Sequence, residues 1–217
     1  YKKTIGSSHQ QIAGIIKKLG CEDVLDLGCA GGFLAEALGK KWKGSLTGVE
    51  VDKSWSDAAG LKTYTKVVWE DLNKPNFDKV LDGKLFDAVV IADVLEHLEK
   101  PKTIVLQATK LLKSGGYLIT SLPNNDFLPV AFLRKISPFF KMNKGPLDFT
   151  HQHFYNLKTA RRLYNGRKNL KLIEKKATPP PLPEIITPIA LAAARLVPYY
   201  FGYQTIFVHQ KELSLKI

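Results

Sequence analysis

The chain has 217 residues, of which 45% are hydrophobic and 24% are charged, the ordinary mixture of a globular protein. This composition excludes a disordered, collagen-like or coiled-coil chain, and the length suits a single α/β domain. The two cysteines, Cys21 and Cys29, are too few for a disulfide framework or a four-ligand zinc site, so we expect a cytoplasmic protein. The most apolar region, 185–208, is interrupted by proline, glycine and arginine, so we expect no transmembrane segment.

The net charge of +12 is concentrated in one segment. Residues 134–176 hold 12 basic side chains and two acidic ones, a net +10, whereas 1–133 and 177–217 each carry +1. Such a segment is either a solvated lysine-rich face or a surface that meets an anionic partner. The partner could be a phosphorylated small molecule, a nucleic acid or a lipid surface.

Predicted helices and strands alternate through the first half of the chain. Ser7 or Ser8 is expected to begin a helix that ends at Gly20. Buried strands are predicted at 24–27, 46–51, 65–69, 86–92 and 117–122, and helices at 33–38, 54–60 and 103–112. Five strands that alternate with helices predict a doubly wound, mostly parallel α/β sheet.

The pattern changes after Pro123. We expect irregular structure over 123–156, followed by a helix, a strand, a second helix and a last strand at 157–164, 170–177, 188–197 and 204–209. The apolar segment 182–201 is predicted to pack under the sheet, and a lid, a dimer surface or a peripheral membrane contact are the alternatives. No internal repeat or domain boundary is visible, so 1–217 is predicted to be one domain.

The clearest motif is V-L-D-L-G-C-A-G-G at 24–32, a strand that runs into a glycine turn and a helix. Glycines there let the backbone approach a ligand closely. The dinucleotide-binding pattern G-x-G-x-x-G fails at two of its positions. The segment instead resembles the first motif of class I S-adenosylmethionine-dependent methyltransferases, an acidic residue followed by G-x-G-x-G. Asp26, Gly28 and Gly32 match this motif, and Ala30 replaces the middle glycine.

Four further segments resemble the family's motifs in the family's order, namely 48–52, 69–72, 86–98 and 111–124. The resemblance implies a Rossmann-like fold whose seventh strand is antiparallel and pairs beside 170–177. It also implies a cofactor-binding half, 7–124, and an acceptor-side half, 125–217. Glu50 would accept hydrogen bonds from the ribose hydroxyls and Asp71 from the adenine amino group. The predicted S-adenosylmethionine site comprises Asp26, Gly28, Ala30, Gly32, Glu50, Val51, Asp71, Leu72 and Asp93.

Two histidines are candidates for catalysis. His97 closes the segment D-x-x-E-H at 93–97, which resembles the E-x-x-E-H of ubiquinone-type O-methyltransferases, where the group can hold a divalent metal. We predict a catalytic His97 and no metal site, with a metal ligand or a cap of the next helix as alternatives. His151 lies in D-x-x-H…Y, similar to a segment that closes over the acceptor in small-molecule methyltransferases. A loop-fixing hydrogen bond is its alternative role. Asn124, Asp148 and Tyr155 complete the predicted acceptor pocket.

Two motifs that the sequence lacks narrow the range of acceptor molecules. No Asp/Asn-Pro-Pro-Tyr follows the fourth strand and no Pro-Cys pair is present, which argues against methylation of nucleic-acid bases. The basic segment 134–176 falls where this family builds acceptor recognition and favours an anionic small molecule. We therefore expect O-methylation of a sugar, a lipid-linked intermediate or a quinone precursor, with S-adenosylhomocysteine as the product. An RNA methyltransferase and a non-catalytic methyltransferase-like interaction domain are the alternatives.

Overall fold

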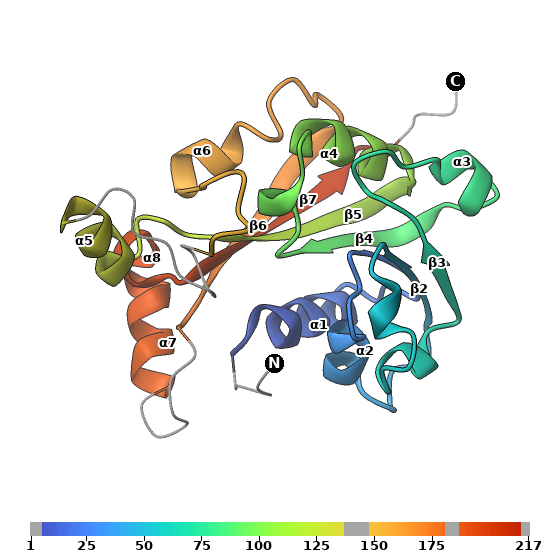
Figure 1. Cartoon of the computed structure of the whole chain (residues 1–217), viewed down its shortest axis with the longest axis horizontal. Helices are drawn as coiled ribbons and strands as arrows, with labels where there is room; N and C mark the ends of the chain where they lie inside the picture. The colour runs from blue at the N-terminus through green and yellow to red at the C-terminus, as the bar shows by residue number, and fades with distance from the viewer. Residues whose placement is uncertain (1–5, 137–147, 181–186, 214–217) are drawn as a thin grey trace.

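The computed structural model describes residues 6–136, 148–180 and 187–213, and its centre is a seven-stranded sheet in the order β3-β2-β1-β4-β5-β7-β6. The first five strands are parallel, while β7 runs antiparallel between β5 and β6 (Figure 1). This topology confirms the predicted Rossmann-like fold with its antiparallel last strand. The strands are β1 Asp23–Leu27, β2 Ser45–Glu50, β3 Lys66–Trp69, β4 Phe86–Ala92, β5 Leu112–Pro123, β6 Leu170–Thr178 and β7 Gln204–Lys211.

Helices cover both faces of the sheet. In the view of Figure 1, α1 and α2 lie below it and α4 and α6 lie above it. The helices are α1 Ser8–Lys18, α2 Phe33–Leu38, α3 Phe77–Val80, α4 Pro101–Lys110, α5 Leu128–Ile136, α6 Leu157–Arg161, α7 Thr187–Leu196 and α8 Pro198–Phe201. Three short 3₁₀ turns are η1 Lys53–Trp55, η2 Leu61–Thr63 and η3 Leu95–His97. Among the residues described, no helix is both long and apolar enough to cross a membrane.

The sheet separates two apolar clusters. One lies between the sheet and α1 and α2, and contains Ile12, Ile16 and Leu34. The other lies on the face of α4 and α6, and contains Ile104 and Val105. Strand β4 contributes alternate side chains to both clusters and is buried over its last five residues, as the apolar pattern of 86–92 predicts.

The start of α1 follows its sequence signal. The Ser7 side chain accepts a hydrogen bond from the backbone N–H of Gln10, and Gly20 adopts a positive φ of 66° just beyond the end of the helix. The first turn of α1 lies at the carboxyl ends of the strands. There the hydroxyl of Ser8 donates a hydrogen bond to the carboxylate of Asp93, which directly follows β4.

Three predicted segments differ from the structure. Residues 54–60 form no α-helix, because Gly60 packs on the backbone of Gly31 and Gly32 and holds the segment in short 3₁₀ turns. The stretch 123–156 is not wholly irregular, since it contains α5, whose proline at its second position is tolerated in a first turn. Helix α7 is not a plain core helix: Ala194 is buried, but Ile189 is 72% exposed and Leu196 is 82% exposed.

Candidate active site

The turn after β1 has the backbone geometry that its glycines predict. Gly28 and Gly32 have positive φ values of 81° and 83°. A Cβ at Gly28 would lie 2.4 Å from the side chain of Val94, and one at Gly32 would lie 2.3 Å from the backbone of Gly60. Ala30 is also left-handed, with a φ of 42°, although it carries a Cβ. The turn is therefore tightly packed on its protein side.

Glu50, at the end of β2, fixes this turn. One carboxylate oxygen accepts the backbone N–H of Ala30 at 2.8 Å, and the other accepts those of Val51 at 2.8 Å and Asp52 at 3.0 Å. A carboxylate offers about four acceptor positions, so capacity remains for a further donor. Val51 is 60% exposed beside it. The role of Glu50 toward ribose stays a prediction, and the structure adds a role in positioning the loop.

Asp26, at the carboxyl end of β1, is almost completely buried. Burial raises its pKa to about 7, the nearby charge of Glu50 adds to this, and a 2.6 Å hydrogen bond from the hydroxyl of Tyr64 opposes it. Tyr64 belongs to no recognised motif, so its contact with Asp26 could not be foreseen. The carboxyl group is thus paired with a neutral donor and is poorly solvated.

An aromatic side chain lies over the same turn. The ring of Trp55 packs so closely on Gly31 that a Cβ there would lie 3.0 Å from it. Phe33 meets Trp55 edge-on, with ring centres 6.0 Å apart, and His9 of α1 meets Phe33 at 5.9 Å. The sequence analysis missed this row of rings, which lines the turn from α1 to η1.

The predicted adenine-side residues lie next to Glu50 along the sheet edge. Strand β3 pairs Trp69 with Glu50, and Asp71 follows two residues later. Asp71 is exposed and accepts the backbone N–H of Asn73 at 2.8 Å. Leu72 is buried in the apolar cluster on the α4 face. Asp71 is therefore placed for a ligand, whereas Leu72 is a core side chain.

Asp93 links three elements at the centre of the sheet. It follows β4 in a left-handed conformation, with a φ of 57°. Its carboxylate accepts hydrogen bonds from Ser121 of β5 at 2.6 Å and from Ser8 of α1 at 3.1 Å. Burial lowers the pKa of neighbouring His9, and the charge of Asp93 opposes that effect. Ser8 and Ser121 are site residues that the motifs did not identify.

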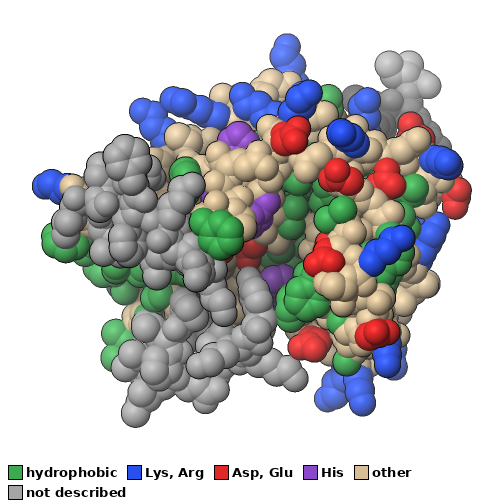
Figure 2. Space-filling view, in the orientation of Figure 1, with side chains coloured by type: hydrophobic (Ala, Val, Ile, Leu, Met, Phe, Trp, Pro, Cys, Tyr) green, Lys and Arg blue, Asp and Glu red, His purple; other side chains and the backbone are tan. Residues whose placement is uncertain are grey.

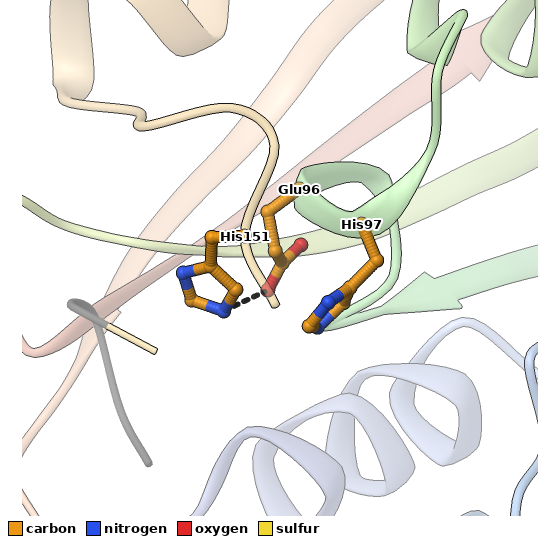
Figure 3. A group of neighbouring side chains, drawn as sticks. All are labelled: Glu96, His97 and His151. Atoms are coloured by element: carbon orange, nitrogen blue, oxygen red, sulfur yellow. Dashed lines mark ion pairs between the residues drawn. The ribbon is translucent and has the colours of Figure 1, made fainter. Parts of the chain in front are cut away.

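Glu96, His97 and His151 form a compact group beside Asp93 (Figure 3). The two imidazole rings are 4.8 Å apart and edge-to-face, and Nε2 of His151 lies 4.0 Å from a carboxylate oxygen of Glu96. Glu96 and His151 are buried, whereas His97 is half-buried. The two predicted catalytic histidines thus meet, and the carboxylate of Glu96 lies beside both of them.

Backbone hydrogen bonds hold the loop of His151 against η3. The N–H groups of Gln152 and His153 both donate to the carbonyl oxygen of Glu96, at 2.8 and 3.1 Å. The side-chain amide of Gln152 donates to the carbonyl of His97 at 2.9 Å. The hydroxyl of Thr150 donates to Asp148 at 2.7 Å and lies 3.1 Å from Nδ1 of His97. The motifs around His97 and His151 are therefore one site.

The charges in this group are strongly perturbed. Burial raises the pKa of Glu96 well above its ordinary value, and repulsion from Asp93 and Asp148 adds to the effect. Burial also acts to raise the pKa of Asp148, but two hydrogen bonds from Thr150 and the histidine charges outweigh it, so that pKa is lowered. One carboxylate oxygen of Glu96 is buried and accepts no hydrogen bond from the described residues.

The group also fits a divalent cation. One ligand atom from each of the three side chains lies within 4.8 Å of the others. Two imidazoles and a carboxylate suit transition-metal ions such as Zn²⁺, and the unpartnered oxygen of Glu96 offers a ligand. The metal alternative for His97 is therefore supported by the donor set that surrounds it.

Asn124 and Tyr155, predicted for the acceptor pocket, are both buried. Asn124 is buried, and its side-chain amide donates to the carbonyl of Gly202 at 2.8 Å, which ties the end of β5 to the segment before β7. Tyr155 is buried in the apolar cluster, and its carbonyl accepts the N–H of Asn125 at 2.8 Å. His209 is a packing residue, with its ring centre 4.0 Å from that of Tyr164. Figure 2 shows the hollow on this face, with histidine and acidic side chains along it.

A family model described as a methyltransferase domain matches residues 4–175. Among curated relatives, the mitochondrial ubiquinone biosynthesis O-methyltransferase of Candida albicans is 32% identical over 109 residues, which are 48% of this chain and 33% of the relative. The ubiquinone biosynthesis O-methyltransferase of Colwellia psychrerythraea is 29% identical over 149 residues, 66% of this chain and 58% of the relative. The chain thus spans about a third to somewhat over half of these relatives.

Solved structures share the fold. Magnesium protoporphyrin IX methyltransferase from Synechocystis PCC 6803 with bound SAH matches with a TM-score of 0.63 at 16% identity, over 94% of this chain and 84% of that one. A SAM-dependent methyltransferase from Archaeoglobus fulgidus matches with a TM-score of 0.59 at 21% identity, over 94% and 95%. Since the family model covers most of the sequence and the fold agrees, the chain belongs to the class I S-adenosylmethionine-dependent methyltransferases.

Proposed function

We propose that this methyltransferase transfers the methyl group to an oxygen atom of a small acceptor. The acceptor would bind next to the side chains of Glu96, His97 and His151. The observation that carries the proposal is the joining of two motifs into one site, because the loop of His151 is hydrogen-bonded directly to η3. A buried imidazole next to the cofactor strands suits removal of a hydroxyl proton. The matched curated relatives are named as O-methyltransferases of ubiquinone biosynthesis, which supports a phenolic, quinone-type acceptor.

In this mechanism the acceptor oxygen attacks the sulfonium methyl carbon in line. The new O–C bond forms while the C–S bond breaks, and S-adenosylhomocysteine leaves with the bonding electron pair. The hydroxyl proton passes to the imidazole of His151. Burial raises the pKa of Glu96, which disfavours its charged form, so we assign the imidazole as the base. General-base catalysis of this kind contributes about 10²–10⁴-fold to the rate.

A divalent metal is a second candidate for the same group. Glu96, His97 and His151 would hold it, and the unpartnered carboxylate oxygen of Glu96 supports this assignment. When bound, the metal would act as a Lewis acid on the acceptor oxygen. A titration of the protein with Zn²⁺ or Mn²⁺ separates the two roles. Binding that is lost in Glu96→Gln supports the metal, and the absence of binding leaves His151 as a base.

The cofactor site is tested by calorimetric titration with S-adenosylmethionine and S-adenosylhomocysteine. We expect Glu50→Gln to lower the affinity about tenfold or more, because an amide cannot replace the carboxylate that accepts three backbone N–H groups. Glu36→Gln, on the exposed side of α2, is the matched control and keeps the affinity of the wild type. Equal binding by both variants would contradict the assignment of Glu50.

The acceptor is tested by a methylation screen over dihydroxyphenols, phosphorylated sugars, lipid-linked intermediates and RNA. We expect His151→Gln to lower kcat about 10²–10⁴-fold with cofactor binding retained. His153→Gln, two residues away and outside the group, is the control. Methylation of RNA alone, or full activity of His151→Gln, would overturn the proposal.

A further inference from the structure

Three helices at one end of the sheet expose an apolar surface. Figure 1 shows α5, α7 and α8 grouped there. The end of β5 is tied to the segment after α8, since Asn124 donates to the carbonyl of Gly202 and the rings of Phe127 and Tyr203 are 5.6 Å apart. Apolar side chains on these helices and between α7 and α8 are exposed by 41–82%, and we call them the α5–α7–α8 surface: Leu128, Phe132, Ile189, Leu196, Val197, Tyr200 and Phe201.

A small cavity opens beside this surface. It has a volume of about 110 Å³ and lies between the end of β6, the last turns of α7 and the start of α8. Lys175, Lys176 and Arg195 line it, together with Thr205. The hydroxyl of Thr205 is buried and makes no hydrogen bond within the described part of the chain. The space is large enough for several waters or a phosphate-sized anion, and the Thr205 hydroxyl is a donor in its lining.

Among the described residues, the charged side chains that line the cavity are all basic. The sequences of α5, α7 and α8 contain no aspartate or glutamate. Glu174 on β6 is paired with Lys18 of α1 at 3.4 Å, which leaves its charge directed away from this group. Among the described residues, no ion pair joins Lys175, Lys176 or Arg195 to an acidic side chain. The cavity therefore has basic residues in its lining and exposed apolar side chains beside it.

We propose that the α5–α7–α8 surface docks on a membrane of anionic phospholipid, with a headgroup phosphate in the cavity beside Lys175 and Arg195. Aliphatic side chains beside cations match the boundary between headgroups and acyl chains. A nucleic acid would use the cations but would leave Ile189 and Leu196 without a partner. Helix α7 has ten residues, about 15 Å, so it lies along the surface and does not cross the roughly 30 Å hydrocarbon core. This contact goes beyond the proposed reaction and does not depend on it.

The test is sedimentation of the purified chain with vesicles, without cofactor or acceptor. We expect binding to vesicles of phosphatidylcholine mixed with phosphatidylglycerol, little binding to pure phosphatidylcholine, and release as salt rises. Leu196→Ser should lower partitioning about tenfold, and Lys175→Gln and Arg195→Gln about fivefold each. Leu85→Ser, a 45% exposed leucine just before β4, is the matched control and should bind as the wild type does.

Several outcomes overturn this proposal. Equal binding to both vesicle types would show that the cavity does not bind an anionic headgroup. Absence of binding to any vesicle would show that the surface does not dock on a membrane. Binding of inorganic phosphate without vesicle binding would identify a soluble anion as the ligand. A dimer in sedimentation velocity that Leu196→Ser dissociates, again without vesicle binding, would assign the surface to a second copy of the chain. None of these results bears on cofactor binding or methylation, so the two proposals fail separately.

Discussion

At the scale of single residues, Asp26 gives the site an unusual dependence on pH. The carboxyl group is buried, its folded pKa is about 7, and its unfolded pKa is about 3.9. Because the folded state holds the proton more tightly, the contribution of Asp26 to the free energy of unfolding is highest below about pH 4. It falls as the pH rises toward 7, by about 1.4 kcal/mol per unit from this group.

Asp26→Asn should remove this dependence, since an amide does not titrate and still accepts the hydroxyl of Tyr64. Denaturant unfolding of both proteins between pH 4 and pH 8 measures it. Other titrating groups are common to the two proteins and cancel in the difference. The difference between their free energies of unfolding should therefore change through that window, and two parallel curves would contradict the raised pKa.

The glycine turn permits a second residue-scale prediction. Gly32→Ala places a methyl group 2.3 Å from the backbone of Gly60, in addition to the strain of a positive φ. Gly20→Ala has the same kind of φ, 66°, with nothing within 4 Å, so it measures the strain alone. We expect about 1–2 kcal/mol of destabilisation for Gly20→Ala. Gly32→Ala should cost clearly more and should also weaken cofactor binding. Equal losses in thermal unfolding would refute the contact with Gly60.

At the scale of elements, α6 begins directly after the loop that carries His151. Asn156 begins the helix with a capping box. Its side-chain oxygen accepts hydrogen bonds from the backbone N–H groups of Lys158 and Thr159, and the hydroxyl oxygen of Thr159 accepts one from the backbone N–H of Asn156. Asn156→Ala should lower the free energy of unfolding by about 1 kcal/mol. Asn156→Asp keeps the acceptor and should retain the stability of the wild type. If the two variants were equally stable in denaturant titrations, the cap would contribute nothing.

The elements that the sequence predicts correctly are those in which one local pattern decides the outcome. Strand β4 is apolar at nearly every position, and the Ser7 cap precedes an apolar helical repeat. The misses depend on tertiary contacts. Gly60 leaves no room for a helix beside the glycine turn, and α7 buries Ala194 while it exposes the larger side chains of Ile189 and Leu196.

The prediction of the site is limited in the same way, by contacts between segments distant in sequence. Motifs place Asp26, Glu50 and Asp93 at the ends of neighbouring strands, because parallel strands end on one side of a sheet. The meeting of His97 with His151 follows from backbone hydrogen bonds that Gln152 and His153 donate to Glu96, a contact distant in sequence that no motif encodes. Tyr64 and Trp55 approach the glycine turn from outside every motif, so only their packing reveals them.

At the scale of the whole molecule, the last strand described lies inside the sheet. Strand β7 pairs with β5 on one side and β6 on the other, and Ile206, Phe207 and Val208 are completely buried. Strands β3 and β6 form the edges. The chain therefore closes its core only when its C-terminal part has arrived, which makes folding depend on contacts distant in sequence.

Hydrogen exchange should reproduce this order. Amides of Ile206–Val208 are expected among the slowest, together with those of β4, because they exchange only on global unfolding. Amides of the edge strands β3 and β6 that make no hydrogen bond to the neighbouring strand should exchange faster through local opening. Exchange of β7 amides as fast as those at the free edge of β6 would show that the last strand detaches independently of the core.

The indole of Trp55 lies over Gly31 while remaining 37% exposed to solvent. Any molecule that seats itself on the glycine turn alters the surroundings of that ring, and a tryptophan emits light whose wavelength depends on its surroundings. The chain thus carries its own optical reporter at the turn. Occupancy can be followed by fluorescence in a cuvette with no label attached, before the acceptor of the reaction is known.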